Sequence, residues 1–303
     1  MARSKFTVLL VSFLIGSGAA FGQVLNPADV PKEQERRPEE QAVEAGRLRS
    51  WELPPVEVVG EERPQLREEE RIGKYKQPRW TARRRFGRTR VYVRPEGEYE
   101  FEVWFIPVIS EDGKVEEIET QYEFEFGLPH RLQVDLYLVP LKTYTREGGT
   151  TVQTMGLAEQ KFEIRWALAD WGAIPGNPTL YFEYGMKGEE DKVEAKLLLA
   201  DQTPIPGLHW GLNGVYEKVL GSEGQEFALT AGISQTIVDE KFSLGAEVEF
   251  KAETGEEETE TELWIGPSLQ IRPSPPSHFD LAALVDTGNA PRTKLIAIFG
   301  WEF

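Results

Sequence analysis

Charged residues recur at every second position within otherwise apolar segments of this chain. The set comprises Asp135, Glu163, Arg165, Glu183, Glu194, Lys196, Glu247 and Glu249. Residues of the same parity point to one face of a β-strand, so these charges should gather on one face of a sheet. If that sheet closes, opposite charges can pair across its interior and like charges can set a cation preference. We therefore expect these side chains to line a lumen, either as a selectivity-determining surface or as a salt-bridged filling.

A basic cluster lies just before the region of alternation. It consists of Arg83, Arg84, Arg85, Arg88, Arg90 and Arg94. The cluster belongs to residues 23–95, a charged stretch rich in Pro, Glu and Arg without a sustained period, which favours a largely irregular structure. Because the interior that follows is expected to be acidic, the arginines predict a periplasmic or plug segment that enters or caps the lumen. Contact with anionic cell-wall polymer or lipid headgroups is the alternative.

The charged residues lie on predicted strands, because the sequence from residue 96 onward alternates with the two-residue period of a β-strand. In residues 98–105 glutamates alternate with aromatic and aliphatic residues, and in residues 131–138 leucine and valine alternate with other residues, most of them polar. The pattern continues to Phe303 in about twelve segments, each near the roughly 9 to 11 residues that a tilted strand needs to cross a bilayer. Residues 96–303 therefore predict an all-β fold, an antiparallel transmembrane β-barrel of about twelve strands.

The connections distinguish a barrel from a soluble β-sandwich, whose strands alternate in the same way. Tight turns, such as residues 127–130 and 238–241, alternate with longer polar connections, such as residues 143–160 and 286–293. Short periplasmic turns opposite longer external loops are typical of outer-membrane barrels. Because the bilayer core offers no hydrogen-bond partners, every backbone group must be paired within the protein, and the strands must therefore close into a ring. The sandwich, with its aromatic residues in a buried core, remains the alternative.

The N-terminus has the layout of a secretory signal. Arg3 and Lys5 precede an apolar run, residues 6–15, and small residues follow as far as Gly22. This order predicts a signal peptide over residues 1–22, because the run is too short for a membrane-spanning helix. The protein is therefore expected to be exported, to the outer membrane of a Gram-negative bacterium.

The C-terminus carries a second sequence feature typical of a targeting signal. Phe299, Trp301 and Phe303 alternate at the end of the chain. This pattern resembles the C-terminal recognition signal of bacterial outer-membrane barrels, a family in which the assembly machinery reads the last strand. The resemblance implies two partners, the barrel-assembly machinery and outer-membrane lipid.

Composition and histidine placement exclude several function classes. The chain has 51 acidic and 34 basic residues and a net charge of −17, which argues against a nucleic-acid partner. Of its three histidines, His130 and His278 fall in short turns and His209 follows another. All three are expected at the periplasmic end, away from the outer leaflet where a serine–histidine lipase would act. With no cysteine and no ligand spacing, we expect no enzyme activity, no metal and no cofactor.

A second resemblance bears on function. Residues 122–136, Tyr-Glu-Phe-Glu-Phe-Gly-Leu-Pro-His-Arg-Leu-Gln-Val-Asp-Leu, and residues 243–248 are similar to strands of the phenol-degradation meta-pathway outer-membrane proteins. The resemblance covers about a tenth of the chain and implies passage of an unknown small solute. We therefore expect a passive outer-membrane channel or transporter. A structural or surface-interaction barrel with a filled lumen is the alternative.

Overall fold

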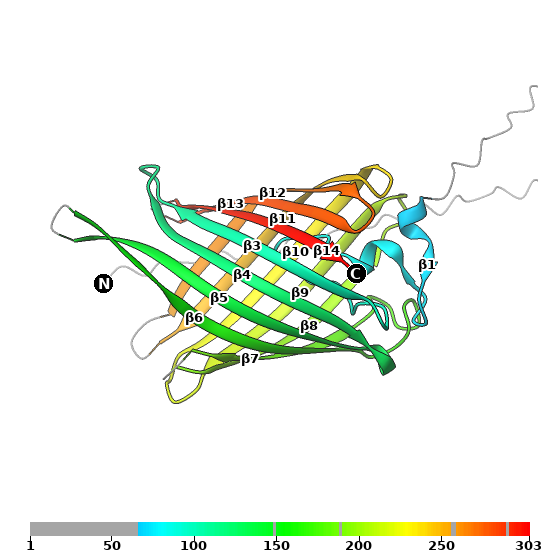
Figure 1. The fold of residues 1–303 in the computed structure, drawn as a ribbon, viewed down its shortest axis with the longest axis horizontal. Coiled ribbons are helices and arrows are strands. Elements are labelled where there is room, and N and C mark those ends of the chain that lie inside the picture. The colour runs from blue at the N-terminus through cyan, green and yellow to red at the C-terminus, as the bar shows by residue number, and fades with distance from the viewer. Residues whose placement is uncertain (1–65, 148–149, 188–189, 256–258, 289–290) are drawn as a thin grey trace, which may run out of the picture. The chain divides into compact units, whose positions relative to one another are not determined.

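A closed, antiparallel barrel accounts for most of the chain (Figure 1). The computed structural model describes residues 66–147, 150–187, 190–255, 259–288 and 291–303. Its barrel strands are β3 (Tyr99–Ile109), β4 (Val115–Leu128), β5 (Leu132–Glu147), β6 (Thr150–Ala167), β7 (Thr179–Met186), β8 (Lys192–Gln202), β9 (Leu208–Val219), β10 (Gln225–Val238), β11 (Phe242–Thr254), β12 (Thr259–Ser274), β13 (Ser277–Asp286) and β14 (Thr293–Glu302). The described residues thus contain twelve barrel strands, which confirms the predicted all-β fold.

Each strand pairs with the next along the chain, and β14 closes the ring by pairing with β3. In this closing pair Phe299 lies opposite Val103 and Trp301 lies opposite Phe101. A closed ring leaves no strand edge with unpaired backbone groups. The alternative of two stacked sheets is therefore wrong.

The barrel has a polar interior and an apolar exterior, which is the reverse of the distribution in a soluble protein. On β3, Glu100 and Glu102 are buried inside whereas Phe105 is 47% exposed, and on β5 Asp135 is buried whereas Leu136 is 45% exposed. Large apolar side chains are exposed in this way on every barrel strand from β3 to β14. An apolar exterior around a polar interior suits a hydrocarbon solvent rather than water.

The connections follow the predicted alternation with two differences. At the terminal end, where β3 begins and β14 ends, the turns are short except for residues 168–178. At the opposite loop end, residues 143–160 are mostly strand, because β5 and β6 remain paired as far as Glu147 and Thr150. The prediction of a long loop there was wrong, because these residues continue the paired strands of the hairpin instead of forming an irregular loop. Figure 1 shows this hairpin reaching beyond the barrel wall.

Residues 66–97 precede the barrel and contain only short elements: η2 (Arg67–Glu69), β1 (Arg71–Ile72), β2 (Gln77–Pro78) and η3 (Arg79–Ala82). Apolar side chains anchor this segment at the terminal end. Trp80 and Tyr92 each meet Trp171 edge-on, with ring centroids 5.6 and 5.1 Å apart. Trp171 belongs to the connection between β6 and β7, so the extra length of that connection has a packing role.

The predicted signal peptide, residues 1–22, and residues 23–65 lie outside the described residues. Among the residues that the structure describes, no helix has the length and apolarity needed to cross a membrane. Between η3 and β3, residues 83–97 contain no helix or strand. We call residues 66–97 the plug segment, a name that refers only to the position of residues such as Arg90 inside the barrel.

Candidate functional site in the barrel lumen

The backbone of the plug segment is held by polar side chains of the barrel wall. On β11, Glu247 accepts the backbone N–H groups of Gly87 and Arg88, both at 2.8 Å. On β9, Asn213 accepts the N–H of Arg90 at 2.7 Å and donates to its carbonyl at 2.8 Å. These side chains replace a partner strand, so the irregular backbone inside the barrel is not left without hydrogen bonds.

A socket made by two glycines receives Phe86. Gly211 on β9 and Gly232 on β10 are paired neighbours. A Cβ atom on Gly232 would lie 2.4 Å from the ring of Phe86, and one on Gly211 would lie 3.3 Å from it. Phe86 is fully buried there. Only glycine leaves room for the ring at these two wall positions.

Three arginines of the plug segment bind carboxylates of β4. Arg90 donates to Glu123 at 2.6 Å and to Glu125 at 3.2 Å. Arg84 donates to Glu123 at 3.2 Å, and Arg94 donates to Glu125 at 2.9 Å. All of these side chains are at least nearly nine-tenths buried. Buried ions of this kind are tolerated only when paired, so plug and wall depend on each other.

A second row of carboxylates, on β3, meets the same arginines. Arg84 donates to Glu102 at 2.9 Å, and Arg94 forms an ion pair with Glu100. His278, at the start of β13, lies 2.5 Å from Glu100. The glutamates at residues 98–105 were recognised as a polar face, but these two were not predicted as site residues.

The remaining predicted arginines contact other parts of the barrel interior or its rim. Arg88 pairs with Glu249 at 2.5 Å, and Glu249 raises the pKa of Arg88. Arg83 pairs with Glu302 near the chain end at 2.6 Å. The six predicted arginines therefore lie along the lumen from its terminal rim inward.

Arg85 is the least well compensated of these arginines. It donates to Glu68 at 3.2 Å and to Thr236 at 2.8 Å, and it lies 3.0 Å from His209. Burial lowers its pKa despite the nearby carboxylate. The pKa of Arg90 shifts in the opposite direction. Burial lowers it, but the negative charges of Glu123 and its neighbours have the larger effect and raise the pKa well above the ordinary value.

The predicted lumen-lining residues divide into three groups. Arg165 binds Asp135 at 2.8 Å and also Glu163, so these side chains fill the wall side of the lumen. Glu247 and Glu249 hold the plug segment, as described above. The third group lines a cavity: Glu183, Glu194 and Lys196.

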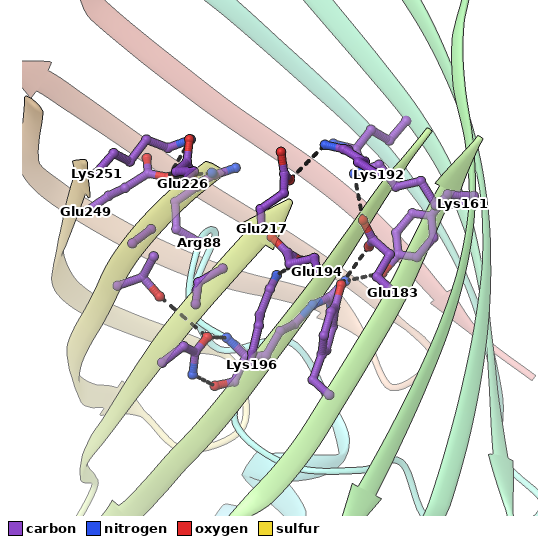
Figure 2. A pocket seen from close by; sticks show the side chains of 18 of the residues that line it. Arg88, Lys161, Glu183, Lys192, Glu194, Lys196, Glu217, Glu226, Glu249 and Lys251 are labelled. Carbon is purple, nitrogen blue, oxygen red and sulfur yellow. Dashed lines mark hydrogen bonds and ion pairs between the residues drawn. The ribbon is translucent and has the colours of Figure 1, made fainter. Parts of the chain in front are cut away.

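This cavity lies between the plug segment and the loop end and has a volume of about 240 Å³ (Figure 2). Gly87, Arg88 and Arg90 of the plug segment form part of its surface. The other charged lining residues are Glu119, Glu159, Lys161, Glu183, Lys192, Glu194, Lys196, Glu217, Glu226, Glu249 and Lys251. Charges of the two signs are close to balanced and mostly paired, as in Lys196 with Glu194 at 2.7 Å and Lys192 with Glu217 at 2.9 Å.

The histidines lie at the terminal end of the barrel, and the structure differs from the expectation at one of them. His130 lies in the turn η4 (Pro129–Arg131) and His209 follows a turn as the second residue of β9, both as expected, whereas His278 is the second residue of β13 rather than part of a turn. The side chains of His209 and His278 are buried. Among the described residues, their hydrogen-bond partners are Arg85 for His209, and Asp280 and Glu100 for His278. No serine is among these partners.

Three groups of side chains in the described residues are close enough to share one metal ion. They are Glu100, Glu102 and His278; Glu102, Glu123 and Glu125; and Glu123, Asp135 and Glu163. Each group combines residues of at least two strands, so spacing along the sequence did not reveal them. The arginine pairs described above already supply positive charge to each group.

The predicted assembly signal lies on the last strand. Phe299 packs against Phe279 with ring centroids 5.0 Å apart, and Trp301 is 40% exposed on the outer face. Phe303 is 76% exposed, and its N–H donates to the carbonyl of Tyr99 at 3.0 Å. Its recognition by the assembly machinery stays a prediction.

Comparison with known proteins bears on the fold. No protein-family model matches the chain, and no curated protein matches it. Among solved structures, the COG4313 outer membrane channel from Pseudomonas putida F1 is similar with a TM-score of 0.50 and 11% identity, over 70% of this chain and 97% of the channel. The chain has the fold of an outer-membrane β-barrel.

Two other barrels are similar at lower scores. The KdgM porin has a TM-score of 0.45 and 6% identity, over 65% of this chain and 98% of the porin. The translocator domain of the autotransporter NalP from Neisseria meningitidis has a TM-score of 0.47 and 12% identity, over 68% of this chain and 88% of that domain. The likeness concerns the fold alone, and membership of the phenol-degradation family is not shown.

Proposed function

We propose that the protein is an outer-membrane channel or transporter for small polar solutes, without catalytic activity, whose passage the plug segment closes. The observation that carries the proposal is the charged cavity of about 240 Å³ that ends at Gly87, Arg88 and Arg90 of the plug segment. A lumen of this kind offers a solute both hydrogen bonds and charge compensation. The resemblance to phenol-degradation meta-pathway proteins supports the passage of small molecules.

One side chain of the barrel wall accepts two backbone N–H groups of the plug segment, so loosening of the segment can be tested in the full chain with a single substitution. Glu247→Ala removes the acceptor of two plug N–H groups. We expect this variant to conduct more than the wild type in planar bilayers. Glu226→Ala is the matched control, because Glu226 lines the cavity and pairs with Lys251 at 3.2 Å.

A disulfide can then hold the plug segment in place. The hydroxyls of Thr89 and Thr230 lie 3.2 Å apart, and the chain has no cysteine of its own. With T89C and T230C added to Glu247→Ala, oxidation should abolish the extra current and reduction should restore it. Equal currents in the oxidised and reduced protein would contradict closure by the plug segment. No current in any variant would favour the filled-lumen barrel.

A second candidate function rests on the hairpin of β5 and β6. These strands have 16 and 18 residues, whereas β7 has 8. A hairpin that extends beyond the barrel wall offers its backbone to a partner at the cell surface. Shortening it by deleting residues 144–153 should leave conductance unchanged and abolish surface binding if this candidate is correct.

A further inference from the structure

The guanidinium of Arg90 lies among carboxylate, hydroxyl and aromatic groups of the barrel wall. It donates to Glu123 at 2.6 Å, to Glu125 at 3.2 Å and to the hydroxyl of Tyr137 at 2.8 Å. Its central carbon lies 5.5 Å from the ring centre of Trp104. Carboxylates combined with an aromatic ring are the groups that recognise guanidinium and ammonium ions.

The site can be reached from the cavity. Arg90, Trp104 and Tyr137 all line the cavity, whereas Glu123 behind them is fully buried. The Arg90 side chain is 11% exposed, so it forms the boundary between the cavity and the buried carboxylates. A solute in the cavity therefore meets Arg90 before it can reach the buried carboxylates of Glu123 and Glu125.

Around the Arg90 side chain, the carboxylates of the barrel wall outnumber the guanidinium groups that the plug segment contributes. Glu100, Glu102, Glu123 and Glu125 share the guanidinium groups of Arg84, Arg90 and Arg94. Arg165 also approaches Glu123, at 3.8 Å, but it is bound more closely by Asp135. Removing Arg90 would leave buried carboxylates short of a counter-ion, which favours uptake of a replacement cation.

We propose that the place of the Arg90 side chain binds a free solute bearing a guanidinium or primary amine group. Such a solute competes with Arg90 for Glu123 and Glu125 and thereby loosens the plug segment. The inference deepens the proposed function and rests on it for the statement that solutes enter the cavity. It identifies the class of solute as small organic cations and makes Arg90 an internal mimic of that class.

Chemical rescue in the full chain tests this site. Arg90→Ala removes the groups that ethylguanidinium contains, so that probe should restore the missing contacts. We expect the apparent melting temperature of Arg90→Ala in detergent to be lower than that of the wild type and to rise saturably with ethylguanidinium chloride. Sodium chloride at the same ionic strength should not produce this rise. Calorimetry should give a binding constant for the same variant.

Two variants show whether the probe binds where Arg90 was. Adding Glu123→Gln to Arg90→Ala should weaken ethylguanidinium binding about tenfold or more, because a charge-assisted hydrogen bond is replaced by a neutral one. Lys251→Ala, which removes a cavity cation outside the site, should show no saturable rescue. If Arg90→Ala does not fold, Arg90→Gln keeps more of the side-chain volume and is tested with guanidinium chloride at low concentration, because the glutamine side chain occupies the place of the ethyl group.

Absence of binding by the folded variant, or binding unchanged by Glu123→Gln, would overturn the inference. Because binding is read without any current, a protein that does not conduct can still pass or fail this test. A conducting protein that binds no ethylguanidinium would keep the proposed function and lose the solute class.

Discussion

Residues inside the lumen show how a charged interior is stabilised. Glu123 receives hydrogen bonds from Arg84 and Arg90 and also from Tyr137 at 2.6 Å, and it is fully buried. A carboxylate in such a place is stable only while its cationic partners remain, and the partners depend equally on it. The alternating charges predicted the acidic lining, but not which carboxylate meets which arginine. That pairing depends on how an irregular backbone turns, and period-two alternation carries no information about irregular backbone.

Glu123 should stabilise the folded protein through its ion pairs with Arg84 and Arg90. Glu123→Gln leaves two buried guanidinium groups short of charge, so it should lower the free energy of unfolding by about 3 kcal/mol or more. Glu226→Gln breaks a more exposed pair with Lys251 and should cost about 1 kcal/mol or less. Urea unfolding of the two variants in lipid vesicles, followed by tryptophan fluorescence, gives the comparison. Equal losses would contradict the view that the buried network matters more.

The glycine socket for Phe86 gives a prediction at the scale of elements. In Gly232→Ala the new Cβ would lie 2.4 Å from the Phe86 ring, so the plug segment should no longer seat fully. Trypsin should then cut the folded variant within residues 83–94 faster than it cuts the wild type. Gly214→Ala, on β9, is the matched control, because a Cβ there has no neighbour within 4 Å.

A compensating substitution sharpens that test. Phe86→Ala removes the ring that the new Cβ would meet, so Gly232→Ala combined with Phe86→Ala should be cut no faster than Phe86→Ala alone. Faster cutting of the combined variant would mean that Gly232 acts on the plug segment by another route.

The strands themselves were predictable because each keeps one parity over many residues, and the closed barrel of twelve strands is confirmed. The length of the hairpin at residues 143–160 was mispredicted, since polar residues continue as strand when a partner strand runs beside them. His278 was placed in a turn, although it is the second residue of β13, because strand ends cannot be fixed by a period of two alone. The glycine socket was not predicted. Gly211 and Gly232 lie inside strands with an otherwise regular alternation, and a glycine at such a position can mark the close approach of another segment.

At the scale of the whole molecule, the apolar exterior requires a lipid environment. Leu136 is 45% exposed on the outer face of β5, so Leu136→Arg should destabilise the folded barrel in bilayers, by up to about 2 to 4 kcal/mol if the residue lies near the midplane. Leu220→Arg, in the connection after β9, should cost about 1 kcal/mol or less. Refolding into vesicles across a urea series measures both. A negligible cost at Leu136 would contradict contact with hydrocarbon.

The plug segment lies inside the barrel and contacts β10 through Thr89 and Thr230. The most direct measurement is disulfide formation between T89C and T230C in isolated outer membranes without added reductant. Because the two native hydroxyls are 3.2 Å apart, the pair should cross-link nearly completely, and T89C alone should stay fully reactive to a maleimide after denaturation. Free thiols in most molecules of the folded pair would contradict the claim.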